Sequence, residues 1–434
     1  METVSLQKTI EIIAKYDVIV AGAGPAGICA AVAASRMGAS VALVERYGVV
    51  GGNLSVGHVG PILGAVGKGT MREEIVRLLD VPFNDMIGEV GVAHDMEKAK
   101  IRLAQFVDRP NITVYLQTAV AEVIKEGSRI TGLILSGKEG LRAITGKVII
   151  DCTGDGDVSA LAGAITEKGR EDGLMQPCTL EFTIDNVDES RAVVCIGDVD
   201  EVKLGDERFL DFCKRRAQEG ALPGNLAAVR LHRTVYPGQR QVNTTQANGI
   251  DATKTADIFR AETELRGQID ILMDFLRRNL PGYESCQLIS SGATVGVRES
   301  RRVMGEYTLT EEDVVAGRTF DDVVVHKAEF IVDIHNPAGA GQAEDRIQYC
   351  VPYDIPYRCL VPLRVDGLLV AGRCISGTHK AHASYRIMTV CMALGQAAGT
   401  AAALCAQDGE LPRTLDVRKV QDALASQGVD LFYK

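Results

Sequence analysis

Two histidines in the last quarter of the chain carry the side chain best suited to proton transfer at neutral pH. His379 and His382 lie three positions apart, just before a long apolar segment. Imidazole can act as an acid or a base near neutral pH, so one of them could donate or accept a proton in a reaction. The alternative is that both hold a loop in place through hydrogen bonds. Two histidines without further obvious ligands are too few for a typical metal site, and we predict no bound metal.

Four arginines form a second group of candidates, and these are Arg298, Arg301, Arg302 and Arg386. A guanidinium group matches the shape of a carboxylate and also binds other anions. Arg298 and Arg386 are therefore candidates for contact with a substrate. The alternative is that Arg298 and Arg302 pair with the nearby Glu299 and Glu306, or with the phosphates of a cofactor.

Two further histidines are weaker candidates. His58 lies in a glycine-rich segment and could line a bound ligand, although it could equally be an ordinary loop residue. His335 lies in the segment Asp333-Ile334-His335-Asn336-Pro337, and we interpret it as structural or as lying at the edge of a cap domain. Three tyrosines could form pocket walls but are more typical of core positions, and these are Tyr307, Tyr353 and Tyr357.

A strand, a glycine turn and a helix near the start of the chain form the element that must position such groups. Residues 18–21 are apolar and predict a buried parallel strand, and Gly22, Gly24 and Gly27 follow at the G-x-G-x-x-G spacing. Residues 28–37 are rich in alanine and predict a helix, and Glu45 ends the next apolar run. This context makes the glycine pattern a dinucleotide-binding motif rather than an ordinary turn.

Each residue of the motif has a physical role in binding a dinucleotide. Gly22 allows a tight turn, Gly24 lets the backbone approach a pyrophosphate, and Gly27 lets the helix pack closely on the strand. The N-terminus of the helix offers unpaired N–H groups and the positive end of a dipole to the phosphates. Glu45 can accept a hydrogen bond from a ribose hydroxyl. The segment 46–60 that follows is rich in glycine, and we expect it to run close to a flavin ring rather than to form a plain surface loop.

Composition narrows the class of protein. The chain has 434 residues, of which 46% are hydrophobic and 24% charged, and this is typical of a soluble globular protein with two domains. The net charge of −10 argues against nucleic acid as a partner. The 11 cysteines contain no C-x-x-C pair, which argues against iron–sulfur clusters, structural zinc and a secreted disulfide framework. We see no signal peptide and expect a cytoplasmic location.

The pattern of apolar and turn residues predicts the remaining elements. We expect helices at 68–80, 93–108 and 254–279, a small meander of strands at 113–116, 119–125, 130–136 and 142–145, and further strands at 9–13, 147–151, 180–184, 360–362 and 368–372. Residues 200–250 look polar and irregular. Residues 386–405 could be read as a membrane span, but polar side chains interrupt them, and we expect a buried helix starting near 385. A second glycine turn follows Asp151.

These separated glycine sites together resemble the glutathione-reductase-like flavoproteins, and most of all the bacterial family of FAD-dependent oxidoreductases. Further stretches that match this family are 49–52, 296–302, 305–308, 333–335, 353–358, 371–376 and 395–399. The resemblance covers nearly the whole chain. It implies an α/β fold with a Rossmann-like FAD-binding domain, a parallel sheet with a β-meander, and an inserted α+β cap. The implied domains are 1–171 and 351–434 for FAD binding and 172–350 for the cap and substrate.

The same resemblance implies roles for individual residues. The residues expected to bind FAD are Gly22, Gly24, Pro25, Ala26, Gly27, Glu45, Arg46, Gly51, Gly52, Asn53, Val120, Thr153, Gly154, Asp155, Gly372 and Arg373. A helix starting near 384–386 is expected to point its N-terminus at the pyrimidine edge of the flavin. Related succinate dehydrogenases attach the flavin through a histidine just before the paired glycines. Residues 47–50 hold no histidine here, so we predict non-covalent FAD.

The sequence thus predicts a FAD-dependent oxidoreductase, a dehydrogenase or reductase, that transfers a hydride to or from a small polar organic substrate. His379 or His382 would handle the proton, Arg298 and Arg386 would orient the substrate, and His58 is a further candidate that could line the flavin face. No second dinucleotide motif and no disulfide-reductase cysteine pair is evident, so the electron donor or acceptor stays open. Two alternatives also stay open: an electron-transfer subunit that serves a partner protein, and a flavin-dependent biosynthetic enzyme that forms a ring or reduces an alkene. We expect a symmetric homo-oligomer.

Overall fold

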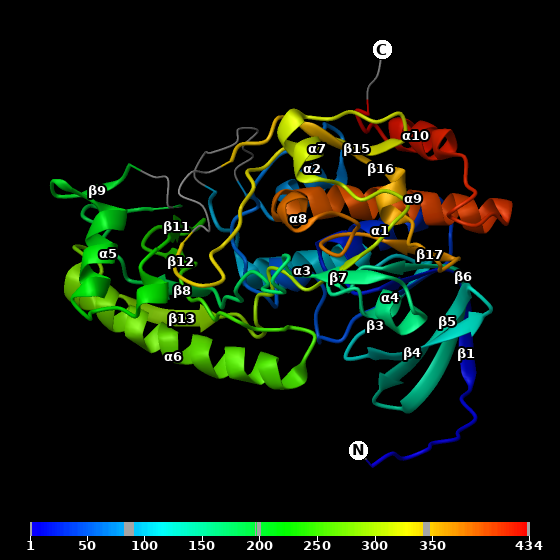
Figure 1. Cartoon of the computed structure of the whole chain (residues 1–434), viewed down its shortest axis with the longest axis horizontal. Helices are drawn as coiled ribbons and strands as arrows, with labels where there is room; N and C mark the ends of the chain where they lie inside the picture. The colour runs from blue at the N-terminus through cyan, green and yellow to red at the C-terminus, as the bar shows by residue number, and fades with distance from the viewer. Residues whose placement is uncertain (1, 82–90, 196, 198–200, 342–347, 432–434) are drawn as a thin grey trace.

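Two neighbouring regions, each with its own sheet, make up the chain (Figure 1). The computed structural model describes residues 2–81, 91–195, 197, 201–341 and 348–431. The larger region contains both ends of the described chain and the first glycine turn. The smaller region is formed by the middle of the chain.

The larger region is built on a seven-stranded sheet with the order β3-β2-β1-β6-β5-β4, in which β17 also pairs with β6. Its strands are β1 (Ile12–Ala21), β2 (Val41–Val44), β3 (Ile112–Tyr115), β4 (Ala119–Glu126), β5 (Arg129–Gly137), β6 (Gly140–Asp151) and β17 (Leu368–Val370). The pairs β1–β2, β1–β6, β2–β3 and β6–β17 are parallel, whereas β4–β5 and β5–β6 are antiparallel. This is a mixed α/β fold with a parallel, Rossmann-like sheet and an antiparallel extension.

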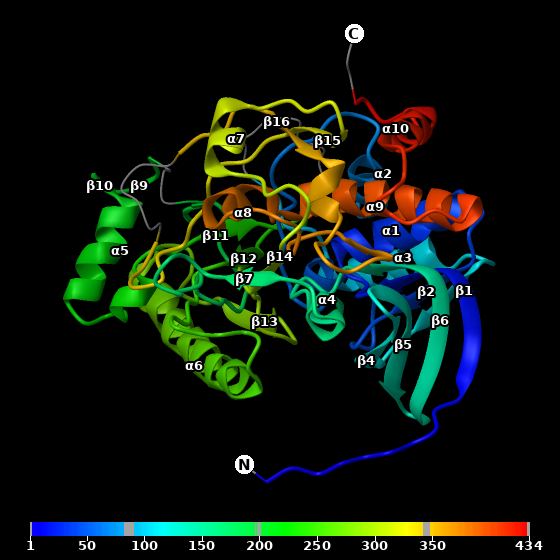
Figure 2. The ribbon, with the colours of Figure 1, turned by 45° about the vertical axis from the view of Figure 1, so that its right-hand side comes forward.

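Successive side chains of the central strands enter two different cores. Val18 and Val20 of β1 pack with α1 (Pro25–Arg36) and α9 (Met388–Asp408). Ile19 of the same strand packs on the other face, with side chains of β5 and α4 (Asp157–Ala162). Because both faces are covered, the parallel strands are apolar throughout rather than alternating. Figure 2 shows α1 and α9 beside each other on one side of the sheet and the β4–β6 strands curling away on the other.

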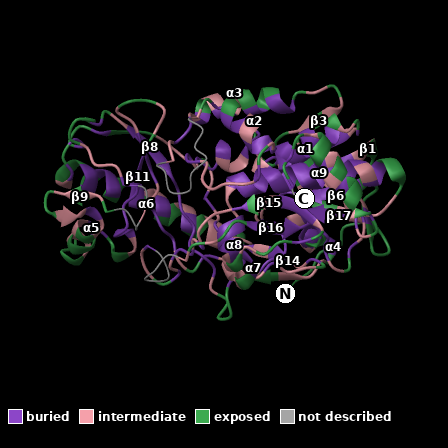
Figure 3. Ribbon diagram, turned by 90° about the horizontal axis from the view of Figure 1, so that it is seen from above, coloured by how far each residue is buried: buried purple, intermediate pink, exposed green. Residues whose placement is uncertain are grey.

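The long apolar segment forms a core helix. By length and composition α9 could cross a membrane, but 94% of its most apolar window is buried inside the protein. Gly395 and Gly399 bring its backbone against Ala26 and Ala30 of α1. Figure 3 shows α1 and α9 largely buried, whereas α3 (Met96–Val107) exposes one side.

The smaller region has a four-stranded antiparallel sheet with the order β11-β12-β8-β13. Its strands are β8 (Phe182–Asp185), β11 (Leu231–Arg233), β12 (Arg240–Val242) and β13 (Gln287–Ser291). The helices α5 (Phe209–Gln218) and α6 (Thr255–Asn279) pack on this sheet and share a separate hydrophobic core with it. The apolar side chains of residues 303–334 belong to the first core instead. The domain ranges 1–171, 172–350 and 351–434 stay a prediction.

Shorter elements connect and cover the two regions. These are α2 (Met71–Leu78), β7 (Thr166–Lys168), β9 (Lys203–Leu204), β10 (Glu207–Arg208), β14 (Arg301–Val303), α7 (Glu311–Ala316), β15 (Val323–Ala328), β16 (Tyr353–Pro356), α8 (His379–Tyr385), α10 (Val417–Ser426) and the 3-10 turns η1 (Gly52–Leu54), η2 (Gly224–Leu226) and η3 (Tyr357–Leu360).

Several expectations about individual elements were wrong. The predicted strands 142–145 and 147–151 form one strand, β6, because β1 pairs with β6 from Ala143 to Asp151. The segment predicted as the first meander strand is β3, which lies parallel to β2. The predicted strand 360–362 begins at the last residue of the 3-10 turn η3 and is no strand, and the irregular segment 200–250 contains α5, β11 and β12. The segment that we expected to form one helix starting near residue 385 forms two, α8 and α9. They are separate because Ile387, which lies between them, has an extended backbone.

Candidate cofactor and active site

A cavity opens at the carboxyl ends of β1, β2, β6 and β17. This is the edge of an open parallel sheet where ligands typically bind. Most of the predicted FAD-binding residues line the cavity, and these are Gly22, Gly24, Pro25, Ala26, Glu45, Arg46, Gly52, Asn53, Val120, Thr153, Gly154, Asp155, Gly372 and Arg373. The other two, Gly27 and Gly51, are absent from this lining. The sequence motifs that lie far apart in the chain therefore meet at one place.

The first glycine turn leaves no room for side chains. Gly22 has a φ of +92°, and a Cβ there would lie 2.5 Å from the carbonyl oxygen of Cys152. A Cβ on Gly27 would lie 1.8 Å from the carbonyl oxygen of Gly22, so its role is to let α1 start directly behind the turn. Gly24 caps α1 without a side-chain hydrogen bond. The free N–H groups of the first turn of α1 therefore stand at the cavity, as a pyrophosphate requires.

Glu45 fixes the shape of the turn from the end of β2. One carboxylate oxygen accepts the N–H of Ala23 at 2.7 Å, and the other accepts the N–H of Tyr47 at 2.9 Å. Burial raises the pKa of this carboxyl, and the two backbone hydrogen bonds oppose that rise. Each oxygen can still accept one more hydrogen bond, so the group remains suited to ribose hydroxyls.

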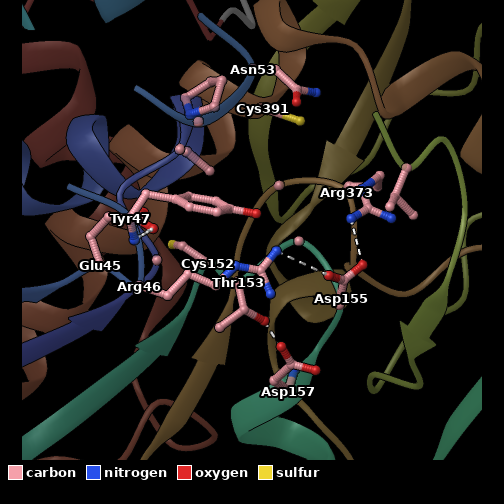
Figure 4. A pocket seen from close by; sticks show the side chains of 18 of the residues that line it. Glu45, Arg46, Tyr47, Asn53, Cys152, Thr153, Asp155, Asp157, Arg373 and Cys391 are labelled. Atoms are coloured by element: carbon pink, nitrogen blue, oxygen red, sulfur yellow. Dashed lines mark hydrogen bonds and ion pairs between the residues drawn. The ribbon is translucent and has the colours of Figure 1, made fainter. Parts of the chain in front are cut away.

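A buried charge network forms the opposite wall (Figure 4). Arg373 donates to Asp155 at 2.6 Å, and Arg46 lies 3.9 Å from the other oxygen of that carboxylate. Ser300 donates to Asp155 at 2.6 Å. Burial alone would raise the pKa of Asp155, but the charge of Arg373 and the hydrogen bond from Ser300 hold it below its usual value. The guanidinium of Arg46 stacks 4.9 Å from the ring centre of Tyr47, which makes a flat surface at the cavity.

The cavity also has lining residues that we did not predict. These are Val44, Tyr47, Thr118, Ala119, Cys152, Asp157, Thr294, Val295, Val297, Ala371, Met388 and Cys391. The hydroxyl of Tyr47 lies 2.8 Å from that of Thr294 and joins the larger region to the smaller one. No sequence pattern links these two residues, which are 247 positions apart. The neighbours of the glycine motifs, in contrast, could have been included because they share the same turns.

Arg386 is the one predicted catalytic residue that lines this cavity in the described part of the chain. It lies between α8 and α9 and donates to Asp333 at 2.8 Å. Arg298 is buried nearby and donates to the carbonyl oxygen of Pro177 at 3.0 Å and to Asn243 at 3.3 Å. Burial and the charge of Arg386 lower the pKa of Arg298 to about 10.

The three predicted catalytic histidines lie outside the cavity lining. His58 contacts Thr183 at 2.9 Å, and burial lowers its pKa to about 4. His379 contacts Glu299 at 2.9 Å and lines a separate cavity of about 1820 Å³. His382 is fully buried against Tyr385, and burial lowers its pKa well below the usual value. The catalytic roles of all three stay a prediction.

No group of three or more His, Cys, Asp or Glu side chains that could hold a metal ion occurs within residues 2–81, 91–195, 197, 201–341 and 348–431. All 11 cysteines are free thiols, and all but Cys350 are buried.

Comparisons with solved structures and curated proteins return flavoproteins and related enzymes. A geranylgeranyl bacteriochlorophyll reductase-like protein from Thermoplasma acidophilum is 14% identical with a TM-score of 0.47, over 97% of this chain and 85% of that one. The p-nitrophenol 4-monooxygenase of Pseudomonas putida DLL-E4 is 11% identical with a TM-score of 0.48, over 95% of this chain and 84% of that one.

Curated relatives match over shorter stretches. A chloroplastic thiamine thiazole synthase of Physcomitrium patens is 30% identical over 125 residues, which is 28% of this chain and 34% of that protein. A soluble pyridine nucleotide transhydrogenase of Hahella chejuensis is 31% identical over 154 residues, which is 32% of this chain and 31% of that protein. The chain thus spans about a third of the length of these relatives.

The family comparison covers almost the whole chain. The model of the FAD dependent oxidoreductase family matches residues 17–424. This range includes the glycine turn at β1, the cavity and the helix α9. The chain therefore belongs to the FAD dependent oxidoreductase family, and its cofactor is FAD.

Proposed function

We propose that this protein transfers a hydride between a small polar organic substrate and non-covalently bound FAD. The observation that carries the proposal is the continuity of the main cavity. It begins at the glycine turn and the free N-terminus of α1 and reaches Arg386 at the start of α9. The glycine turn, which would bind the dinucleotide, and the side chain of Arg386, which would face the substrate, therefore line one cavity.

The residues of the cavity suggest how FAD lies. Gly22, Gly24 and the first turn of α1 would hold the pyrophosphate, and Glu45 the adenosine ribose. Gly52 and Asn53 would lie along the ribityl chain. When bound, FAD supplies the hydride acceptor or donor. The protein must then hold the substrate, exclude water and move the proton.

The start of α9 is suited to the flavin end of the cofactor. Ile387 caps the helix without a side-chain hydrogen bond, and Met388 and Cys391 line the cavity. The positive end of the helix dipole would stabilise negative charge on the pyrimidine edge of the ring. Residues 47–50 contain no histidine for covalent attachment. The hydroxyl of Tyr47 is instead engaged with Thr294.

We further propose that the region between residues 172 and 350 holds the substrate over the flavin. The contact between Tyr47 and Thr294 supports this, because it places the smaller region directly at the cavity. We also propose a cytoplasmic homo-oligomer, and the electron donor or acceptor stays open.

The test is the visible absorption spectrum of the purified protein, recorded anaerobically before and after adding a panel of small organic hydride donors. We expect a flavin spectrum that acid precipitation releases into the supernatant, and bleaching by one class of donor. Failure to bind FAD after reconstitution would contradict the proposal. Flavin that is reduced by dithionite or a partner protein, and by no small donor, would favour an electron-transfer subunit.

A further inference from the structure

Among the buried polar atoms that have no hydrogen-bond partner in the described part of the chain, three belong to one cluster of side chains, of which Arg386 lines the main cavity. They are Nε2 of Gln176, Nδ1 of His335 and Nε of Arg386. Gln176 is 1% exposed and His335 5% exposed. A buried polar atom without a partner costs free energy, and such atoms are rare in native proteins. Three of them in one cluster indicate that the cluster is built to receive a ligand.

The three residues are held together by contacts through their other atoms. Nη2 of Arg386 donates to Oδ2 of Asp333 at 2.8 Å and reaches Oε1 of Gln176 at 3.5 Å. The backbone N–H of His335 donates to the same Gln176 oxygen at 3.2 Å. Nε2 of His335 lies 3.4 Å from Oδ2 of Asp333. Because Arg386 also lines the main cavity, this ring of contacts adjoins the flavin site.

The contacts decide which of the three atoms can donate a hydrogen. The oxygen of the Gln176 amide is occupied, so its unpartnered atom is the NH₂ donor. Nε of Arg386 is also a donor. An ionised Asp333 can only accept, so the hydrogen of a neutral His335 belongs on Nε2, and Nδ1 carries a lone pair. Burial, with the charge of Arg298, lowers the pKa of His335 to about 4 and keeps it neutral at pH 7.

The charge around the cluster favours an anion. Arg386 and Arg230 lie close enough to Arg298 for their positive charges to lower its pKa. Among the described residues, the charges of Asp333 and Glu181 act in the opposite direction on the pKa of Arg298, and burial raises the pKa of Glu181 to about 7. A bound carboxylate would interact favourably with the guanidinium groups of Arg386 and Arg298.

We propose that the substrate is a 2-hydroxycarboxylate, whose carboxylate accepts hydrogen bonds from Nε of Arg386 and Nε2 of Gln176 and whose hydroxyl donates to Nδ1 of His335. Two donors and one acceptor, carried by residues that contact one another or share Asp333 as a partner, match in number and kind the groups of a carboxylate with a hydroxyl on the adjacent carbon. Asp333 is a positioning residue, since it acts through His335 and Arg386. This assignment rests on the proposed function and gives a role in the reaction to His335, which was only a weaker candidate in the sequence.

The reaction balances with the groups named. The C2–H bond breaks, and its electron pair leaves as the hydride that FAD accepts. The O–H bond breaks, its proton moves to Nδ1 of His335, and its electron pair forms the C=O bond. The product is a 2-oxocarboxylate. The imidazolium that forms lies against the Asp333 carboxylate, which stabilises its charge.

A substrate analogue that cannot react tests binding on the FAD-loaded protein. The probe is 2-hydroxy-2-methylpropanoate, which has no hydrogen on C2, and binding is followed as a change in the flavin spectrum. We compare 2-methylpropanoate, which lacks the hydroxyl, and 2-hydroxy-2-methylpropanamide, which lacks the carboxylate. The loss of either group should weaken binding about tenfold or more.

Variants then assign each group to a residue. His335→Phe should bind the hydroxy acid and 2-methylpropanoate with equal affinity, whereas Gln176→Leu should weaken both acids about equally. His335→Asn serves as a milder replacement if the phenylalanine variant does not fold. His326→Phe is the matched control, because His326 also contacts an aspartate, Asp354, at 2.7 Å and has a buried unpartnered Nε2, but lies in β15 away from the Gln176 and Asp333 contacts of His335.

Several outcomes would contradict the proposal that the substrate is a 2-hydroxycarboxylate while leaving the proposed FAD-dependent function intact. Protein that holds FAD but shows no preference for the hydroxy acid contradicts the substrate class. Variants of Gln176 and His335 that lose FAD while their remaining holoprotein binds the acid normally would assign these atoms to the flavin. If the control variant changes the preference equally, the effect is structural. A protein that binds no FAD refutes the proposed function itself.

Discussion

At the scale of single residues, the cavity wall depends on one buried carboxylate. Asp155 is the partner of Arg373 at 2.6 Å and lies near Arg46, and both it and the Arg373 side chain are largely buried. Asp155→Asn leaves the Arg373 charge in the interior without its counter-ion. We expect a loss of about 3 kcal/mol in the free energy of unfolding of the apoprotein, measured by urea denaturation.

An exposed pair provides the control for this substitution. Asp172 pairs with Arg170 at 2.8 Å with comparable geometry, but both side chains are at the surface. Asp172→Asn should therefore leave the urea midpoint almost unchanged. Equal losses of unfolding free energy in the two variants would show that burial does not make the Asp155 ion pair more important for stability than an exposed pair.

The residue scale also shows what a sequence can indicate about a site. Gly22, Gly24 and Glu45, which line one cavity, could be grouped from the sequence because the dinucleotide motif is local and its chemistry fixes the spacing. Gln176 and His335 could not, because they are 159 positions apart and come together through tertiary contacts alone. His335 looked structural in the sequence, and its unpartnered Nδ1 becomes visible once its neighbours are placed.

At the scale of elements, the cofactor turn depends on how closely α9 approaches α1. A Cβ on Gly395 would lie 2.0 Å from the carbonyl oxygen of Ala26, in the first turn of α1. Gly395→Ala must push α1 away from α9 and so displace the N–H groups that face the cavity. We expect a loss of about 2 kcal/mol in stability from overpacking and weaker FAD binding. Thermal unfolding and fluorescence titration with FAD measure the two effects.

The control for this prediction is a glycine in an open helix. Gly267 lies on the exposed side of α6, and a Cβ there meets no atom within 4 Å. Gly267→Ala should raise stability by about 1 kcal/mol, because alanine is the better helix former, and should leave FAD binding unchanged. If Gly395→Ala were equally harmless, the packing of α9 would not position the turn.

Errors in the predicted elements have a common physical cause. The break between α8 and α9 is marked by neither proline nor glycine, and it arises because Ile387 takes an extended conformation where the chain meets the cavity. The sequence of β6 suggested two strands, but β1 pairs with it from Ala143 to Asp151 and keeps it continuous. The local sequence pattern predicts an element well where the element's own residues determine its structure. It predicts an element poorly where pairing with a distant segment determines the structure.

At the scale of the whole molecule, the two hydrophobic cores were partly predictable. The change in pattern near residue 172 indicated a second region, and a separate core does form from residues 178–297. Residues 303–334 join the first core, where they pack with α9 and β16 rather than with the smaller region. The sequence alone could not show this, because apolar side chains fit either core.

Buried histidines should make the whole protein sensitive to acid. Burial lowers the pKa of His58, His232 and His335 to about 4, and it also lowers that of His94 and His382. An unfolded histidine binds a proton below about pH 6.5, whereas these do so only near pH 4 in the folded protein. The unfolded state therefore gains more protons as the pH falls from 6.5 to 4, and stability is lost over that range, by up to about 3 kcal/mol for each of the first three residues.

Glu181 acts in the opposite direction within the same range. Burial raises its pKa from 4.5 to about 7, so the folded state binds the extra proton and gains stability as the pH falls from 7 to 4.5. Burial also raises the pKa of Glu45, Asp157 and Glu329, which act in the same direction as Glu181. We expect the five histidines to outweigh these four carboxyl groups, so that the thermal midpoint of the apoprotein falls between pH 7 and pH 5. Glu181→Gln should make this fall steeper, and His232→Phe should make it shallower. A thermal midpoint that is constant over this range, or a shallower fall in Glu181→Gln, would contradict these pKa shifts. The reason is that Glu181 takes up a proton more readily in the folded state, whereas His232 takes one up more readily in the unfolded state.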